Sequence, residues 1–198
     1  MEDMKSGLLK RTVSELTQIP LGTAADRVKE LQTCCMLTKG ERGRHGGAIL
    51  TATDRINALL ACLFDSAENV TRVRRLDLSL AYYNPLGQKL SVEDNARCAF
   101  QVVEGLGIRF DDLGIALDSI VQSMRCGAFE KWAAGGAVSV SVDLRGKYHA
   151  MLAFDRPQAN VSAIFEFSTE PAMAELPIDR FTRLNTAGFE RLAVDVPS

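Results

Sequence analysis

The chain has 198 residues, and its 25 acidic and 23 basic residues leave a formal net charge of −2. A hydrophobic fraction of 46% and a charged fraction of 24% are ordinary for a globular protein and exclude a mainly disordered chain. No apolar run reaches the roughly 18 residues that a membrane span needs, and no apolar segment follows the charged start, so we expect neither a membrane span nor a secretory signal. The five cysteines include no C-x-x-C pair, which favours a reduced, cytoplasmic location.

Charge is distributed unevenly along the chain. Residues 5–55 contain nine basic and five acidic residues, a balance of +4, so the rest of the chain carries −6. A basic segment joined to an acidic body is typical of proteins that bind a polyanion, although a chance excess on solvated helix faces gives the same balance.

The first predicted elements are two helices separated by a proline. Apolar residues recur with helical spacing over residues 5–17 and predict an amphipathic helix, which Pro20 ends because proline cannot continue the hydrogen-bond ladder. Thr23 with Asp26 predicts the N-cap of the second helix. The buried face of this second helix is predicted to hold Ala24, Val28, Leu31 and Cys35.

A hairpin and a third helix are predicted next. Met36–Thr38 and Ala48–Leu50 predict two short strands, and the glycine-rich basic segment 39–47 predicts the loop between them. Thr51 or Thr53 is the predicted N-cap of the third helix, which carries a continuous apolar stripe.

The hydrophobic pattern changes after residue 65. Helical spacing continues to Asn84, but the alternation of leucines over 76–80 leaves part of this stretch open to a strand. Two more helices are predicted to begin at Ser91 and at the Asp111–Asp112 pair.

Strands follow these helices. Period-two alternation predicts three strands, over residues 138–144, 148–154 and 161–167, which form an antiparallel meander with one apolar face. A final helix is predicted over residues 178–193.

The order of helix, turn, capped helix and basic hairpin is that of a winged helix-turn-helix. Val13–Ala24 resembles the helix-turn-helix of bacterial regulators, Leu31–Leu37 the exit of a recognition helix, and Lys39–Thr51 a wing. This layout resembles small prophage-type DNA-binding proteins of bacteria. The family pattern has glycine in the turn, where this chain has Gln18, and glycine near the end of the recognition helix, where it has Cys35.

We therefore expect an α+β fold: an N-terminal winged helix-turn-helix over residues 1–65, followed by a helical body with a three-stranded antiparallel meander over residues 66–198. The body is expected to serve oligomerisation or effector binding, and the resemblance implies double-stranded DNA as the partner. The residues predicted to contact DNA are Thr23, Ala25, Asp26, Lys29 and Thr33 on the second helix and Lys39, Arg42, Arg44 and His45 in the loop.

No catalytic or metal site can be assembled from the sequence, so we expect neither an enzyme nor a bound cofactor. His45 and His149 lack partners at metal-binding spacing. Cys34 and Cys35 would point about 100° apart on a helix, which does not suit a metal site. The glycine-rich loop lacks the Gly-Lys-Ser/Thr ending of a phosphate-binding loop.

The predicted function is sequence-specific DNA binding by a prophage- or phage-type transcriptional regulator. A single winged helix contacts few base pairs, so we expect a homodimer on paired half-sites. Two alternatives remain open: a DNA-recognition subunit of phage genome packaging, similar to small terminase subunits, and a winged-helix adaptor that binds another protein.

Overall fold

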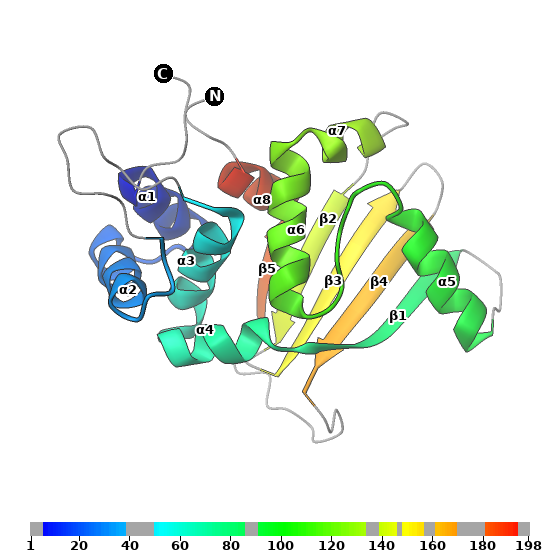
Figure 1. Ribbon diagram of the computed structural model, residues 1–198, viewed down its shortest axis with the longest axis horizontal. Helices are drawn as coiled ribbons and strands as arrows, with labels where there is room; N and C mark the ends of the chain where they lie inside the picture. The colour runs from blue at the N-terminus through cyan, green and yellow to red at the C-terminus, as the bar shows by residue number, and fades with distance from the viewer. Residues whose placement is uncertain are drawn as a thin grey trace.

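The computed structural model describes residues 6–38, 50–85, 91–133, 139–145, 148–156, 161–169 and 181–193. Within these ranges the chain is a mixed α+β fold, with a layer of N-terminal helices beside one antiparallel sheet and further helices over one sheet face (Figure 1). No helix in the described ranges is long and apolar enough to cross a membrane.

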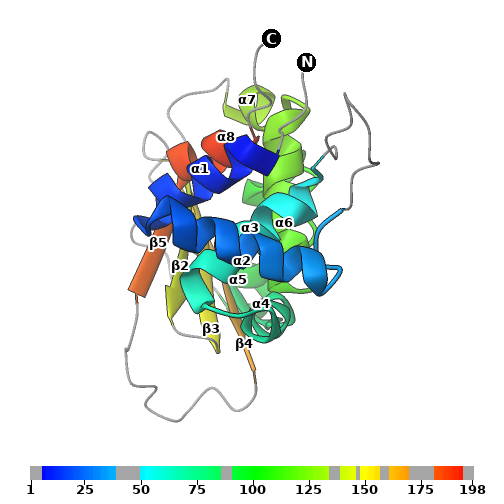
Figure 2. The same cartoon turned by 90° about the vertical axis from the view of Figure 1, so that its left-hand side faces the viewer.

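The N-terminal layer is built on α1 (Ser6–Thr17), α2 (Leu21–Thr33) and α3 (Ala52–Phe64), which pack against one another. Figure 2 shows α1 and α2 in front of α3, and α3 in turn packs against α6 in the body. Leu9, Val13, Ala24, Val28 and Leu31 are buried, as their helical spacing predicted.

The start of α2 differs from the prediction. The helix begins at Leu21 with Pro20 as the N-cap residue, and no side chain caps it, so the predicted cap at Thr23 is wrong. The helix begins after Pro20 because the Pro20 carbonyl accepts the first helical hydrogen bond, from the Ala24 N–H at 3.0 Å. Met36–Thr38 was predicted as a strand, but the structure has no strand there.

The sequence pattern after residue 65 left a helix and a strand open, and the structure contains both, one after the other. Ser66 caps the helix α4 (Ala67–Arg74), and the chain then extends into β1 (Asp77–Pro85). The strand forms because β1 pairs along its whole length with β4, which is a partner more than 75 residues away in sequence.

The sheet has five strands in the described ranges, in the order β1-β4-β3-β2-β5, and all neighbouring pairs are antiparallel. The predicted meander is confirmed as β2 (Ser139–Arg145), β3 (His149–Arg156) and β4 (Val161–Ser168). The three-stranded sheet is nevertheless corrected to five, because β1 and β5 (Phe181–Asn185) extend it on both sides. The helix predicted from residue 178 is correspondingly shorter, since α8 spans only Thr186–Ala193.

The remaining helices cover the apolar face of the sheet. They are α5 (Val92–Val102), α6 (Leu113–Arg125) and the short α7 (Ala128–Ala133). The predicted cap at Ser91 is confirmed, and of the predicted Asp111–Asp112 pair it is Asp112 that caps α6. Phe154 and Phe165 on the sheet are fully buried, and Phe110 stacks on Phe165 with ring centroids 4.1 Å apart. This core is continuous with the core of the N-terminal layer.

Candidate nucleic-acid interface

The turn between α1 and α2 and the end of α2 both have left-handed backbone geometry. Gln18 has φ 56° and Cys35 has φ 57°, and these are the two positions at which the bacterial pattern that the sequence resembles has glycine. Left-handed geometry costs an L-residue about 1–2 kcal/mol, a cost that glycine avoids. The backbone therefore turns here as a glycine would allow, although neither residue is glycine.

The left-handed geometry at Cys35 also corrects one prediction. Cys35 was expected on the buried face of the helix, but α2 ends at Thr33 and Cys35 is exposed. Once the backbone leaves the helix, the spacing of 3.6 residues per turn no longer applies to Cys35.

We expect Gln18→Gly to raise the free energy of unfolding by about 1 kcal/mol, because glycine removes the left-handed strain. Urea denaturation followed by circular dichroism measures the change. Gln32→Gly inside α2 is the matched control and should lower the free energy of unfolding by up to about 1 kcal/mol. A loss of stability in both variants would contradict the assignment of strain to Gln18.

The helix α2 presents one polar face to solvent. Asp26, Lys29 and Thr33 are exposed along that face, Thr23 is exposed near the helix start, and Ala25 is half-buried. The Thr33 hydroxyl donates to the Lys29 carbonyl at 3.1 Å. The predicted loop contacts Lys39, Arg42, Arg44 and His45 lie outside the described residues.

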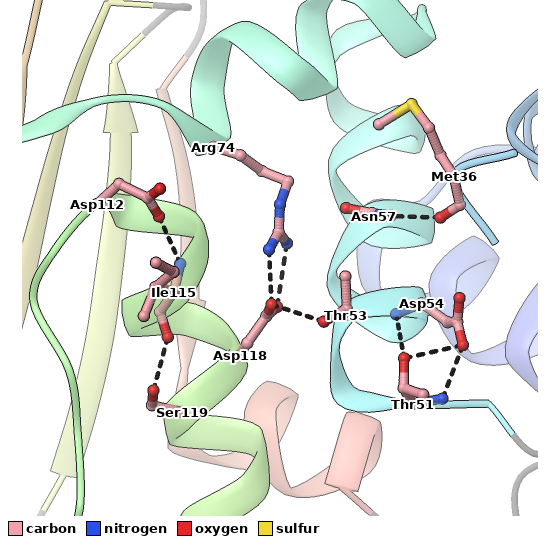
Figure 3. Close-up of polar contacts among 10 residues, drawn as sticks. All are labelled: Met36, Thr51, Thr53, Asp54, Asn57, Arg74, Asp112, Ile115, Asp118 and Ser119. Atoms are coloured by element: carbon pink, nitrogen blue, oxygen red, sulfur yellow. Dashed lines mark hydrogen bonds and ion pairs between the residues drawn. The ribbon is translucent and has the colours of Figure 1, made fainter. Parts of the chain in front are cut away.

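The two chain segments that flank residues 39–50 are joined by one buried carboxylate. Asp54 Oδ1 accepts from the Thr38 N–H at 2.7 Å, and Asp54 Oδ2 accepts from the Thr38 hydroxyl at 2.8 Å. Asp54 Oδ2 also accepts from the Thr51 N–H at 2.8 Å and the Thr51 hydroxyl at 2.9 Å, which completes a capping box at the start of α3 (Figure 3). Asn57 Nδ2 donates to the Met36 carbonyl at 2.8 Å. The first turn of α3 therefore fixes both ends of the loop that contains the predicted wing.

Other charged side chains of α2 hold it against α4. Glu30 Oε1 accepts from the Ala67 N–H at 3.1 Å, and Arg27 lies 3.5 Å from Glu30 and 3.6 Å from Asp65. These two side chains point toward the protein, whereas Asp26 and Lys29 point to solvent. The roles of Arg27 and Glu30 depend on tertiary contacts, and no pattern in the sequence indicates them.

A second polar network joins the N-terminal layer to the body. Arg74 donates through both terminal nitrogens to Asp118, at 2.6 and 3.0 Å, and Asp118 also accepts from the Thr53 hydroxyl at 2.8 Å (Figure 3). Helices α3, α4 and α6 meet at this carboxylate. Gly114 allows the close approach, since a Cβ there would lie 2.8 Å from Arg74 Cβ.

The described residues contain no candidate metal cluster, and the buried thiol of Cys62 is not activated. No group of three or more His, Cys, Asp or Glu side chains in the described ranges lies close enough to hold a metal ion. Burial raises the pKa of the Cys62 thiol to about 11, with Arg27 lowering it and Asp65 raising it by smaller amounts. Cys62 therefore stays protonated at neutral pH and is a poor nucleophile.

Comparisons with known proteins identify no relative of this chain. A scan against protein-family models, a search of curated proteins and a search of solved structures each found no match.

Proposed function

We propose that this protein binds double-stranded DNA sequence-specifically, with α2 as the recognition helix and the loop of residues 39–47 as the wing. The observation that carries the proposal is the left-handed backbone at Gln18 and Cys35, the two glycine positions of the pattern that the sequence resembles. The exposed polar face of α2 and the packing of α1, α2 and α3 also support it. In this arrangement α2 enters the major groove and reads base edges.

The loop residues would supply affinity and not sequence readout. Lys39, Arg42, Arg44 and His45 would contact phosphates, and each phosphate contact contributes about 0.9 to the slope of log affinity against log salt. The carboxylate of Asp54 would hold the loop at a fixed position relative to α2.

We propose transcriptional control by a homodimer as the biological role, since one winged helix reads too few base pairs to find a site in a genome. A cytoplasmic location is part of this proposal. It is supported by Cys34 and Cys126, which are exposed and form no disulfide among the described residues, as suits a reduced compartment.

The experiment is binding-site selection from a random duplex pool with the wild type and with the double variant Lys29→Ala/Thr33→Ala. We expect the preferred sequence to change, because a side chain that reads a base supplies about 1–3 kcal/mol of discrimination and alanine supplies none. Lys131→Ala on the exposed surface of α7 removes the same charge from the body and should leave the selected sequence unchanged.

Two outcomes would contradict the proposal. The first is an identical selected motif for wild type and double variant. The second is the absence of any salt-dependent DNA binding, which would favour a protein-binding adaptor. The assembly state, measured by light scattering, separates a regulator from a packaging subunit, since a ring of many copies would favour packaging.

A further inference from the structure

One face of the sheet has no described helix over it. Figures 1 and 2 together show α5 and α6 over the other face of the sheet and no labelled helix over this one. On the central strand β3, Leu152 and Phe154 point toward the helices and are fully buried. Met151 and Ala153 point the opposite way and are only half-buried. We call the side of the sheet to which Met151 and Ala153 point the open face.

The middle of the open face is apolar. The strand register places five apolar side chains in two adjacent rows, which are Leu80 and Tyr82 of β1, Ile164 of β4, and Met151 and Ala153 of β3. All five are half-buried or exposed, and Leu80 is 41% exposed. A sheet face that contacts only water usually carries polar residues, so a continuous apolar patch of this kind marks an interface.

The open face is large enough for a stable interface. Strands lie about 4.8 Å apart and rise about 3.3 Å per residue, so the five strands present a flat area of about 550 Å². Side chains that stand out from the sheet make the accessible area larger. Specific protein interfaces bury at least about 600 Å² on each partner. The open face can therefore supply the whole of one side of such an interface.

A second copy of the chain fits the open face in one of two twofold arrangements. Two identical sheets pack face to face with their strands nearly aligned, and the twofold axis between them runs either along the strands or across them. An axis along β3 places Glu166 against the partner's Asp143, because the register puts both in the row of Met151. Two carboxylates in this position repel each other. An axis across the strands instead places Glu166 against the partner's Ile164 and Asp143 against the partner's Ser141.

The axis across the strands also gives complementary contacts along β3. When it passes Leu152, in the middle of the strand, Met151 lies over the partner's Ala153, so a long side chain meets a short one. His149 and Asp155 lie three residues to either side of Leu152, so His149 meets the partner's Asp155, and symmetry repeats this contact. An imidazole donates a hydrogen bond to a carboxylate and forms an ion pair with it when protonated.

Both side chains of this contact can form a further bond. His149 Nε2 lies 3.9 Å from Glu166 Oε2, which is too far for a hydrogen bond. Asp155 accepts from the hydroxyls of Ser162 and Ser139, and a carboxylate has about four lone-pair sites. His149 and Asp155 are half-buried, so each is accessible to a partner.

We propose that two copies of this chain pack their open faces together about a twofold axis that crosses the strands at Leu152. The interface deepens the homodimer of the proposed function, and its link to DNA rests on that function. The axis runs from β1 toward β5, and the N-terminal layer lies beside the β5 edge of the sheet (Figure 1). Rotation about this axis keeps both layers at the same end of the dimer. The two α2 helices therefore lie on one side, as binding to paired half-sites requires.

The test is sedimentation equilibrium of the full chain at micromolar concentration without DNA, and we expect a dimer for the wild type. Ala153→Glu should raise the dissociation constant of the dimer at least tenfold, because the carboxylate meets apolar side chains of the partner. Circular dichroism should show a folded chain, since Ala153 points away from the core. Val92→Glu is the control, because Val92 on α5 is 76% exposed and lies off the open face, and it should leave the dissociation constant unchanged.

A mixing experiment tests the contact of His149 with Asp155. His149→Glu and Asp155→Lys should each weaken the dimer at least tenfold, because the first opposes two carboxylates and the second opposes two basic groups. An equimolar mixture should form a heterodimer of nearly wild-type affinity, because the introduced glutamate faces the introduced lysine and the other pair is native. Residues 149 and 155 lie about 20 Å apart along the extended strand, so no contact within one chain produces this recovery.

Several results would overturn the interface. They are a wild-type monomer, a ring of many copies, an unchanged dissociation constant for folded Ala153→Glu, and a mixture that associates no more tightly than its components. If Ala153→Glu does not fold, the mixing experiment decides alone, since recovery requires two folded chains.

The interface and the proposed function can fail separately, because dimerisation is measured without DNA. A dimer that Ala153→Glu dissociates but that binds no DNA would retain the interface and refute the proposed function. A chain that binds DNA but whose dimer is insensitive to Ala153→Glu would do the reverse.

Discussion

Arg55→Met is expected to lower the free energy of unfolding by about 3–5 kcal/mol. Arg55 on α3 is fully buried, and its Nη1 donates to the carbonyls of Leu192 at 2.7 Å and Ala193 at 3.0 Å. Its Nε donates to the Leu50 carbonyl at 3.3 Å. The carbonyls of Leu192 and Ala193 belong to the last turn of α8, the negative end of the helix dipole, so the guanidinium satisfies them and compensates the dipole.

Methionine matches the length of the arginine stem but donates no hydrogen bond. Guanidinium chloride denaturation measures the loss, and Arg97→Met on the exposed surface of α5 is the control, with an expected change below about 0.5 kcal/mol. Because Arg55 joins α3 to α8, it stabilises a contact across the predicted boundary at residue 65. A loss under about 1 kcal/mol would show that this contact contributes little.

Asp54→Asn is expected to lower the free energy of unfolding by about 2–4 kcal/mol. Asp54 is 3% exposed, and its Oδ1 accepts from the Thr38 N–H while its Oδ2 accepts from the Thr38 hydroxyl and from the N–H and hydroxyl of Thr51. An amide has one acceptor oxygen, so its NH₂ group would face an N–H donor whichever way it is turned. The loss combines a weakened capping box with an unsatisfied donor at one end of the loop.

Asp94→Asn is the matched control for this substitution. Asp94 occupies the same capping position in α5, with Ser91 as the N-cap residue, but it is more exposed, and among the described residues its side chain bonds only Ser91 and Arg97. We expect it to cost no more than about 1 kcal/mol. Equal losses at Asp54 and Asp94 would mean that Asp54 acts only as a helix cap.

The same variant tests how the loop contributes to DNA binding. If Asp54 holds the wing in place, Asp54→Asn at a temperature where it remains folded should weaken binding to all DNA sequences and flatten the salt dependence. The preferred sequence should not change, because in the proposed function it is α2 that reads the bases. A fluorescence anisotropy titration over a range of salt concentrations measures both quantities.

The sequence determined those elements whose signals are local. Apolar spacing located α1, α2 and α3. Ser91 with Asp94 identified the cap of α5, and the caps of α3 and α6 were narrowed to two neighbouring candidates each, of which the structure has Thr51 and Asp112. Alternation located β2, β3 and β4, which neighbour one another in the chain. The exposed face of α2 was also predictable, because the buried positions of an amphipathic helix define the opposite face.

The tertiary structure alone decided the features that depend on partners far away in the chain. β1 and β5 are strands because they pair with β4 and β2, and short segments of this kind carry no decisive local pattern. The sequence places the N-cap of α3 at Thr51 or Thr53, but it does not predict the bonds of Asp54 to Thr38, which span 16 residues, or the bond of Arg55 to Leu192, which spans 137. The helices α4 and α6 are joined by the ion pair of Arg74 with Asp118, which spans 44 residues and follows from packing and not from spacing along the chain.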